Sequence, residues 1–318
     1  MLSPQWLGED MERVERLLLA TAGSSVHSIV SEASTHLIKA GGKRVRPALV
    51  LLSARAGESP GAATDLSAAA IELVHLATLY HDDVIDETHT RRGVPTVHSK
   101  WGIEIAVLAG DFLFARGCAL GAEAGGEVPG ILARAIAEVC EGQIVETGSV
   151  GDPHRSVPEY IETIRRKTAA LFGAACELGA ATANATIAAR SSLMTYGENL
   201  GLAFQIVDDV LDLVGDPEVI GKLPGTDLRE GVFTLPVLIA CERDGRLAER
   251  LAAGEREVAT ILPQLESCGA LVSSLATARD HARAAAGALQ ELPESEWRTV
   301  MESLVDSVLA QVPKAAVA

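Results

Sequence analysis

The sequence predicts an all-α fold. Of its 318 residues, 48% are hydrophobic and only 3% are aromatic, with alanine and leucine predominant, which favours closely packed helices. Strand signals are scarce, because no run of alternating β-branched residues lies between hairpin turns. No interdomain linker or low-complexity tail interrupts the chain. We therefore expect one domain over residues 1–318, a single bundle of about ten or more helices.

Glycine and proline breaks separate the expected helices. Residues 57–61 (Gly-Glu-Ser-Pro-Gly) break the chain before a long apolar helix, for which Thr64 or Asp65 is a suitable cap. Residues 88–98 are polar and are predicted to form a loop, and residues 125–130 form a further break.

Two later boundaries have stronger signals. Ser156 and Glu159 form a capping-box pattern with Pro158 in the first turn, which predicts the start of the helix that carries Lys167. A Gly-Asp-Pro sequence at residues 215–217 predicts the end of another long helix.

The main functional signal is an acidic DDxxD pattern that occurs twice, each time in an apolar stretch with helical spacing. The copies comprise Asp82, Asp83 and Asp86, and Asp208, Asp209 and Asp212. Residues four apart share a face of a helix, so Asp82 lies beside Asp86. Carboxylates held together repel each other, and apolar neighbours add a desolvation cost. A divalent cation removes both problems, and oxygen ligands suit Mg²⁺, which usually keeps waters and binds substrate phosphates.

A single DDxxD pattern is often only a solvated acidic face of a helix. Here the preceding segments, residues 71–81 and 201–207, are largely apolar and offer no broad polar face for the acids to join. We therefore predict metal binding at both copies, as two acidic walls that face a polyphosphate. The candidate metal ligands are Asp82, Asp83, Asp86, Asp208 and Asp212.

Cationic residues accompany both acidic patterns. Any one of them is a weak signal, and the GGKRVRP segment alone is compatible with a solvated helix start. Together they predict a grip on phosphate, because arginine offers a bidentate fork and lysine a point charge. They are Lys43 and Arg46 in GGKRVRP (41–47), Arg91 and Arg92 after the first pattern, Lys167, and Lys222 after the second pattern. His75 lies two helical turns before Asp82 on nearly the same face, so it is either a core histidine or a phosphate contact.

Charge and composition exclude several classes. The formal net charge of −16 argues against non-specific nucleic-acid binding. The N-terminus has no signal-peptide layout and no stretch forms a convincing transmembrane span, so a cytoplasmic protein is expected. Five scattered cysteines are expected to be buried free thiols: Cys118, Cys140, Cys176, Cys241 and Cys268.

Four segments resemble the trans-type polyprenyl diphosphate synthases in order and spacing: GGKRVRP (41–47), HDDVIDETHTRRG (81–93), KTAALF (167–172) and GLAFQIVDDVLDLVGDPEVIGKLPGTD (201–227). The resemblance implies an isoprenoid synthase type I fold, in which helices surround a central cavity, and a homodimer. It also implies Mg²⁺-dependent head-to-tail (1′-4) condensation of isopentenyl diphosphate with an allylic diphosphate.

The resemblance further implies a role for each matching residue. Asp82, Asp86 and Asp208 correspond to acids that hold three Mg²⁺ on the allylic diphosphate, within motifs that include Asp83, Asp209 and Asp212. The direct cationic partners of that diphosphate are Arg91, Lys167 and Lys222. The metal-free grip on isopentenyl diphosphate comprises Lys43, Arg46, His75 and Arg92. Thr168 and Gln205 line the region where cationic charge develops.

One position departs from the family pattern. Many relatives have Gly-Lys-x-Thr after the second acidic motif, whereas this chain has Gly231-Val232-Phe233-Thr234. Val232 therefore replaces an expected lysine, which puts allylic affinity in question more than the reaction type.

Chain length is predicted from the helix before Asp82. Ala77 and Thr78 lie about one turn deeper than Asp82, and Val74 lies one turn further. Short-chain relatives carry an aromatic residue near there, whereas these side chains are small, so a C30–C50 product is expected. The alternatives are a geranylgeranyl (C20) diphosphate synthase, a class I terpene cyclase, and a non-catalytic subunit of a heteromeric synthase.

Overall fold

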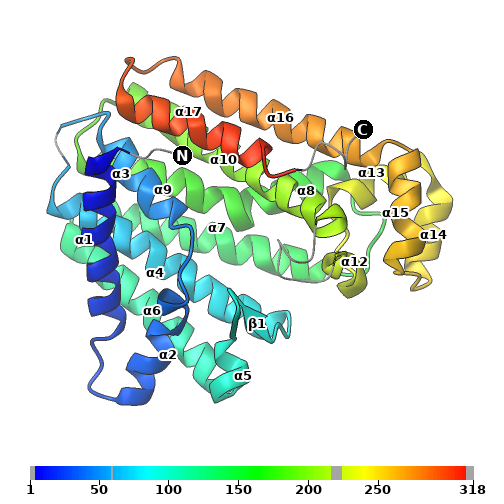
Figure 1. Cartoon of the computed structure of the whole chain (residues 1–318), viewed down its shortest axis with the longest axis horizontal. Coiled ribbons are helices and arrows are strands. Elements are labelled where there is room, and N and C mark those ends of the chain that lie inside the picture. Colours follow the sequence, from blue (N-terminus) through cyan, green and yellow to red (C-terminus); the bar gives the residue numbers. More distant parts are fainter. Residues whose placement is uncertain (1–3, 59, 216–223, 313–318) are drawn as a thin grey trace. The chain divides into compact units, whose positions relative to one another are not determined.

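The computed structural model describes residues 4–58, 60–215 and 224–312, and it confirms the all-α prediction (Figure 1). Helices make up nearly all of its regular structure. The elements are α1 (Gln5–Ala22), α2 (Ser28–Lys39), α3 (Val45–Ala54), α4 (Ala62–Ile85), β1 (Thr90–Arg91), β2 (Val94–Pro95), α5 (Val97–Trp101), α6 (Ile103–Ala124), α7 (Val128–Gly148), α8 (Val157–Ile164), the π-helix η1 (Arg165–Ala169), α9 (Ala170–Thr182), α10 (Ile187–Val214), α12 (Thr226–Glu230), α13 (Leu235–Arg243), α14 (Gly245–Ala252), α15 (Val258–Ser267), α16 (Ala270–Leu289) and α17 (Glu296–Leu309).

The helices form two compact units, each assembled from segments that are distant in the sequence. Unit 1 comprises Met1–Ile136, Ala174–Met194 and Leu292–Val300, and unit 2 comprises Ala137–Gly173, Thr195–Glu291 and Met301–Ala318. The first DDxxD pattern belongs to unit 1 and the second to unit 2. A single domain over residues 1–318 stays a prediction.

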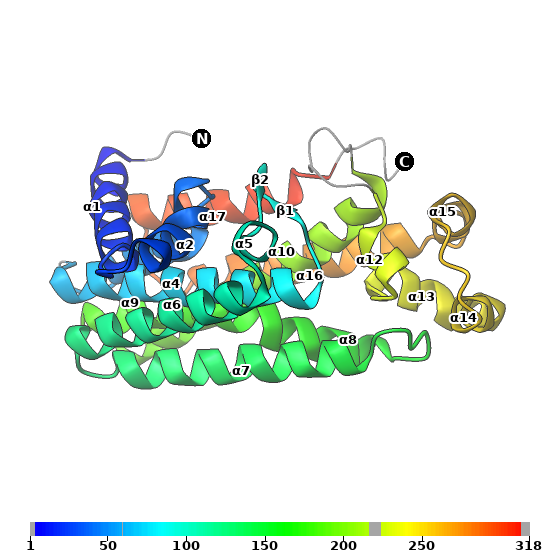
Figure 2. The same cartoon turned by 90° about the horizontal axis from the view of Figure 1, so that it is seen from below.

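In unit 1, α4 and α6 pack closely along each other (Figure 2). Small residues make this approach possible. A Cβ atom added to Gly117 would lie 3.0 Å from the carbonyl oxygen of Ala70, and one added to Gly110 would lie 2.4 Å from His81 Nε2. The inner face of α4 is fully buried. This packing gives the helix that carries the first acidic pattern a rigid support.

The end of α4 is fixed by backbone hydrogen bonds. Glu87 adopts a left-handed conformation (φ 50°), and the N–H of Thr88 donates to the carbonyl of Asp83 at 3.0 Å, which is a Schellman-type ending. The chain then forms a hairpin whose turn, Arg92-Gly93, has positive φ at both residues, as a type I′ turn requires.

Two local predictions in this region need correction. Residues 88–98 are not simply a loop, because they contain the β1–β2 hairpin and the start of α5. The cap of α4 is Gly61, and Thr64 instead sits one turn inside the helix, where its side-chain oxygen accepts from the Gly61 N–H at 3.3 Å.

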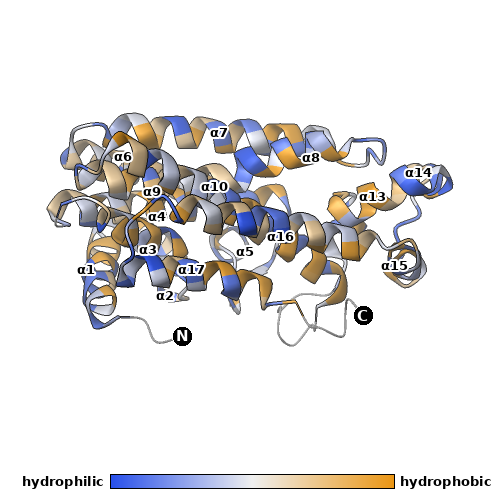
Figure 3. Cartoon of the chain, turned by 90° about the horizontal axis from the view of Figure 1, so that it is seen from above, coloured by the Kyte–Doolittle hydropathy of each residue, from blue (hydrophilic) through white to orange (hydrophobic). Residues whose placement is uncertain are grey.

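In unit 2, α8 and η1 form one continuous helical run with the start of α9. The capping-box prediction is confirmed, because Ser156 accepts from the N–H of Glu159 and the Glu159 carboxylate accepts from the N–H of Ser156. The predicted end of α10 is also confirmed, with Val214 as its last residue. The largely hydrophobic α13 contributes to the core of this unit (Figure 3).

By length and composition alone, α4 and α6 are apolar enough to cross a membrane, and the bent pair α15–α16 would make a third candidate. Within the protein, 61% of the apolar window of α4 and 39% of that of α6 are buried. The cysteine prediction is correct for Cys176 and Cys241, which are buried, and wrong for Cys118 and Cys140, which are exposed.

Candidate active site

Both DDxxD patterns lie at the C-terminal ends of long helices. Asp82 and Asp83 occupy the last turn of α4 and Asp86 is its C-cap, while the second pattern occupies the last two turns of α10. The C-terminus of a helix carries partial negative charge, so these carboxylates are repelled by the backbone as well as by one another. A bound cation relieves both repulsions.

The second acid of each pattern points into the protein. Asp83 is 1% exposed and Asp209 is 3% exposed, whereas Asp82 is half-buried and Asp86 and Asp208 are exposed. Adjacent residues of a helix point about 100° apart, so two consecutive acids cannot serve the same face. The outward acids are therefore the accessible cation ligands, and the inward acids take partners within the protein.

Asp83 holds the hairpin that follows α4. Its Oδ1 accepts from Nε of Arg91 at 2.6 Å, and its Oδ2 is buried without a hydrogen-bond partner among the described residues. Burial raises the pKa of Asp83, and the neighbouring Arg91 guanidinium opposes that shift. Asp83 thus positions Arg91.

A cluster of arginines surrounds His75. Burial holds the pKa of His75 well below its usual value, and the positive charges of Arg46, Arg92, Arg91 and Arg44 lower it further. The imidazole is therefore neutral and can donate one hydrogen bond. Burial also lowers the pKa of Arg46 to about 10, which leaves its guanidinium charged at neutral pH. This part of unit 1 is chemically suited to bind an anion.

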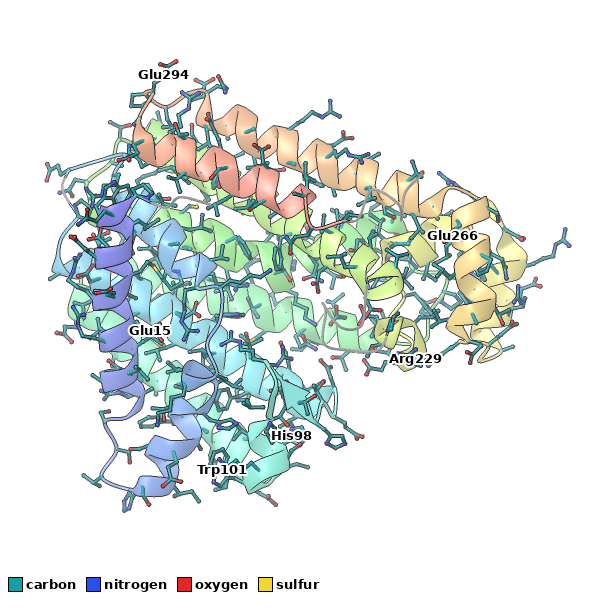
Figure 4. All side chains as sticks on the ribbon, in the orientation of Figure 1. Glu15, His98, Trp101, Arg229, Glu266 and Glu294 are labelled. Carbon is teal, nitrogen blue, oxygen red and sulfur yellow. The ribbon has the colours of Figure 1, made fainter. Side chains whose placement is uncertain are left out.

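Arg44 has a different role from its neighbours. Its Nε donates to Glu15 at 2.8 Å and its Nη1 to the fully buried Glu72 at 3.2 Å; Glu15 is labelled on α1 in Figure 4. Burial raises the pKa of Glu72, and the charges of Arg44, Arg46 and Arg92 oppose that shift. Glu72 is thus the buried counter-charge of the cluster, and it was missed because a glutamate in an apolar helix carries no motif.

Arg92 binds the end of α2. Its Nη1 donates to the carbonyl of Leu37 at 3.0 Å and to the carbonyl of Gly41. Gly42 lets the guanidinium approach, because a Cβ there would lie 2.8 Å from Arg92 Cζ. Its neighbour Lys43 is exposed on the same loop. The glycine pair of the GGKRVRP segment therefore brings the loop and Arg92 together.

Lys167 lies in the π-helical turn of unit 2. Its Nζ forms an ion pair with Glu146 of α7, and both side chains are half-buried. The same turn is tied down by ion pairs from Arg165 and Arg166, whose acceptors are Glu138, Glu141 and Glu162. A π-helical insertion inside a longer helix is often found at a functional site.

Two glycines allow other helices to approach this turn. A Cβ on Gly142 of α7 would lie 2.5 Å from the backbone nitrogen of Lys167. A Cβ on Gly201 of α10 would lie 2.7 Å from Cα of Ala169. The π turn is therefore held between two backbones.

A chain of hydrogen bonds links the π turn to the second acidic pattern. Thr168 Oγ1 donates to Gln205 Oε1 at 2.8 Å, and Gln205 Nε2 donates to Asp209 Oδ1 at 2.8 Å. The hydroxyl of Tyr160 donates to Asp209 Oδ2. Thr168 and Gln205, selected from the sequence, are in contact, whereas Tyr160 gave no sequence signal.

The remaining candidates have simpler settings. Asp212 is buried and accepts from the N–H of Asp227 at 3.2 Å. Lys222 lies outside the described residues. Val232 is half-buried and donates its N–H to the carbonyl of Asp227. Of the residues chosen for chain length, Val74 and Ala77 are fully buried, and Thr78 is half-buried.

The donor set suits a hard cation, although the acids alone do not form a complete site. Among the described residues, no group of three or more His, Cys, Asp or Glu side chains lies close enough to hold a metal ion. Mg²⁺ is ordinarily bound by one or two carboxylates, waters and substrate phosphates, so a partial set is sufficient. The outward carboxylates at the two helix ends fit that requirement.

An all-α fold with carboxylates at helix ends and clustered cations defines a class of enzymes that act on diphosphate substrates with divalent cations. The sequence matches the polyprenyl synthetase family over residues 27–264, so the chain belongs to that family. It is a prenyltransferase of the polyprenyl synthase type.

Individual relatives agree with this assignment. The chain is 38% identical to nonaprenyl diphosphate synthase of Mycobacterium tuberculosis, over 94% of this chain and 91% of the relative. It is 41% identical to a short chain isoprenyl diphosphate synthase of Methanothermobacter thermautotrophicus, over 87% of this chain and 89% of the relative. Polyprenyl synthase of Caulobacter crescentus, solved with calcium and isoprenyl diphosphate, superposes with a TM-score of 0.91 at 40% identity and covers 96% of each chain.

Proposed function

We propose that this enzyme condenses isopentenyl diphosphate with an allylic diphosphate in the presence of Mg²⁺ and repeats the step to make an all-trans polyprenyl diphosphate. The observation that carries the proposal is the pair of DDxxD patterns, each at a helix end and each with a basic group nearby. Arg91 adjoins the first pattern, and the π turn with Lys167 is linked to the second.

The first chemical step needs positive charge at the leaving diphosphate. When bound, Mg²⁺ supplies charge that stabilises the departing diphosphate. We propose that Arg91 and Lys167 each add to that charge. Lys167 forms an ion pair with Glu146, so it exchanges or shares this partner when a diphosphate binds.

The arginine cluster is suited to the second substrate. Isopentenyl diphosphate carries no leaving group that must be ionised, so a metal-free grip by Arg46, Arg92 and Lys43 is sufficient, with neutral His75 as a hydrogen-bond donor. After its alkene attacks the allylic cation, a proton must be lost. We propose that the departed diphosphate accepts this proton.

We further propose a C30–C50 product. The similarity to nonaprenyl diphosphate synthase supports this length over the alternative of a geranylgeranyl (C20) product, although a short chain isoprenyl diphosphate synthase is similarly related. Small side chains along α4 favour the longer product, because Ala77 and Thr78 lie near where short-chain relatives carry an aromatic residue. The paired acids argue against a non-catalytic subunit.

A homodimer is proposed for a reason specific to unit 1. Apolar side chains are exposed on α6, including Ile103 (58% exposed) and Leu108 (62% exposed). Beside them runs an apolar groove between α2 and α6, lined by Ile29, Val30, Ala33, Ile105, Leu108 and Ala109. An exposed apolar surface of this kind is typical of a protein interface. Sedimentation of the purified protein and of Leu108→Glu tests the dimer, and fractionation of cells tests the expected cytoplasmic location.

The decisive experiment is incubation of the purified chain alone with isopentenyl diphosphate, a farnesyl or geranylgeranyl primer and Mg²⁺, followed by product sizing. We expect all-trans products that require Mg²⁺ and are lost in excess EDTA. Asp208→Ala should lower turnover by at least about a thousandfold, because it removes a ligand for transition-state charge. Near-normal turnover of that variant at saturating Mg²⁺ would contradict the metal assignment.

A further inference from the structure

We infer that Tyr160 and Asp209 are positioning residues that fix the direction of the Gln205 amide and the Thr168 hydroxyl. The inference rests on the proposed function, because it assigns these two dipoles to the region where the allylic cation forms. It adds two residues to the site, one of which, Tyr160, lies outside every motif in the sequence.

The four side chains form one unbranched chain of hydrogen bonds within unit 2. Tyr160 donates to Asp209, Asp209 accepts from Gln205 at 2.8 Å, and the carbonyl oxygen of Gln205 accepts from Thr168 at 2.8 Å. Tyr160 and Asp209 are almost completely buried. Water is therefore a poor substitute for any member of the chain.

The spacing on α10 explains why the chain can form. Gly201, Gln205 and Asp209 follow one another at intervals of four residues, so they share one face of the helix. Gly201 lets that face approach the π turn, since a Cβ there would lie 2.7 Å from Cα of Ala169. Gln205 then meets Thr168 one turn later along α10, and Asp209 meets Tyr160 one turn after that.

The chain of hydrogen bonds determines which end of the Gln205 amide faces which neighbour. The amide nitrogen of Gln205 donates to Asp209, which also accepts from Tyr160, and the amide oxygen of Gln205 accepts from Thr168. The hydroxyl of Thr168 donates its only proton to that oxygen. The lone pairs of both oxygens are thereby held together at the π turn, where negative dipole ends can stabilise positive charge.

Asp209 and Asp208 consequently have different roles. Asp208 is exposed and available to a cation, whereas Asp209 is buried and both of its oxygens are occupied by Gln205 and Tyr160. The hydroxyl of Tyr160 matters because it holds the second oxygen of Asp209 while Gln205 holds the first. Without it, the carboxylate can rotate and the amide loses its fixed direction.

The test is Tyr160→Phe, with Tyr196→Phe as the matched control. Tyr196 is a fully buried tyrosine of the same unit whose hydroxyl donates to the carbonyl of Met301 at 2.8 Å. Both variants lose one buried hydroxyl. We expect Tyr160→Phe to lower kcat about tenfold while KM for each diphosphate stays within about twofold. We expect Tyr196→Phe to leave kcat within about twofold and to share only the loss of thermal stability.

Asp209→Asn provides a second variant of nearly unchanged volume. An amide at this position can donate to Gln205, which would turn the Gln205 amide around and point a donor at the π turn. We expect a larger loss of kcat than in Tyr160→Phe, again with KM nearly constant. If Tyr160→Phe does not fold, this variant decides the question by the same criterion.

Several results would overturn the inference. They are an unchanged kcat in the folded variants, an equal loss in Tyr160→Phe and Tyr196→Phe, or an effect confined to KM. Failure of the proposed function is recognised separately, since the unmodified enzyme would then form no prenyl product. In that case, side-chain amide NMR of Gln205 still tests the positioning. Its NH₂ protons should be protected from exchange in the unmodified protein and in Tyr196→Phe, and they should exchange readily in Tyr160→Phe. Equal exchange in all three proteins contradicts the inference.

Discussion

The two substitutions Asp83→Asn and Asp86→Asn make the same chemical change in one motif, and the structure predicts different outcomes. Asp83 is buried and accepts from Arg91 at 2.6 Å, so its substitution weakens a hydrogen bond between charged groups. Such bonds contribute about 1.5–3 kcal/mol, and because Arg91 is partly solvated we expect a loss near 2 kcal/mol in the free energy of unfolding. Asp86 is exposed at the helix end, where a change within about 0.5 kcal/mol is expected.

The Mg²⁺ requirement of catalysis should show the opposite pattern, with the larger effect in Asp86→Asn. Asp86→Asn removes an outward carboxylate, so the Mg²⁺ concentration for half-maximal activity should rise at least about tenfold. Asp83→Asn should shift that concentration less and should instead lower the melting temperature, by about 3 °C for a loss of about 2 kcal/mol in a chain of 318 residues. Thermal melts in EDTA and Mg²⁺ titrations of turnover measure both quantities. If Asp86→Asn is the destabilised variant and Asp83→Asn the one with altered Mg²⁺ dependence, the inward and outward assignment is wrong.

Two further outcomes follow from the cationic groups and their supports. Arg92→Ala should chiefly raise KM for isopentenyl diphosphate, and Lys167→Ala should chiefly raise KM for the allylic substrate, each by roughly ten- to a hundredfold. Steady-state kinetics that show equal effects on both substrates would contradict two separate binding sites. Gly142→Ala should lower kcat about tenfold, because its Cβ would lie 2.5 Å from the backbone nitrogen of Lys167, whereas Gly148→Ala on the same helix meets nothing within 4 Å and should leave kcat unchanged. Equal kcat values in these two glycine variants would show that the π turn tolerates displacement.

The sequence predicted features that depend on local chemistry. The capping box at Ser156 and the end of α10 before Gly215 are set by nearby residues, and both are confirmed. The acidic patterns were also visible, because carboxylates in an apolar helix conflict with their surroundings. A conflict of that kind usually marks a function.

Other features depend on partners that are distant in the sequence. The π turn at residues 165–169 has an ordinary helical sequence, and its form depends on the approach of Gly142 and Gly201. Tyr160 pairs with Asp209 from 49 residues away, which no spacing rule reveals. Cys118 looked buried because α6 is apolar throughout, and the sequence could not show which face of that helix is exposed.

The choice of chain-length residue also changes once burial is known. From Asp82 down α4, a half-buried stripe runs through Thr78, Leu79 and His75, whereas Ala77 is 0% exposed. The sequence placed Ala77 and Thr78 together on the wall of the product tunnel. Burial favours Thr78, because a side chain added there lies on the half-buried stripe, while one added at Ala77 enters the packed core.

We therefore predict that Thr78→Phe shortens the product from C30–C50 to about C15–C20 and leaves the first condensation largely intact. The new ring would lie about one turn below Asp82, roughly 6 Å along the helix axis, where the growing chain must pass. Ala77→Phe should mainly destabilise the protein, by about 1–3 kcal/mol, because it overpacks a filled core. Thr78→Ser controls for loss of the methyl group and should keep the long product. Product sizing by chromatography and thermal melts of all three variants separate the effects. If Thr78→Phe keeps the long product, or if only Ala77→Phe shortens it, the growing chain does not follow the half-buried stripe of α4.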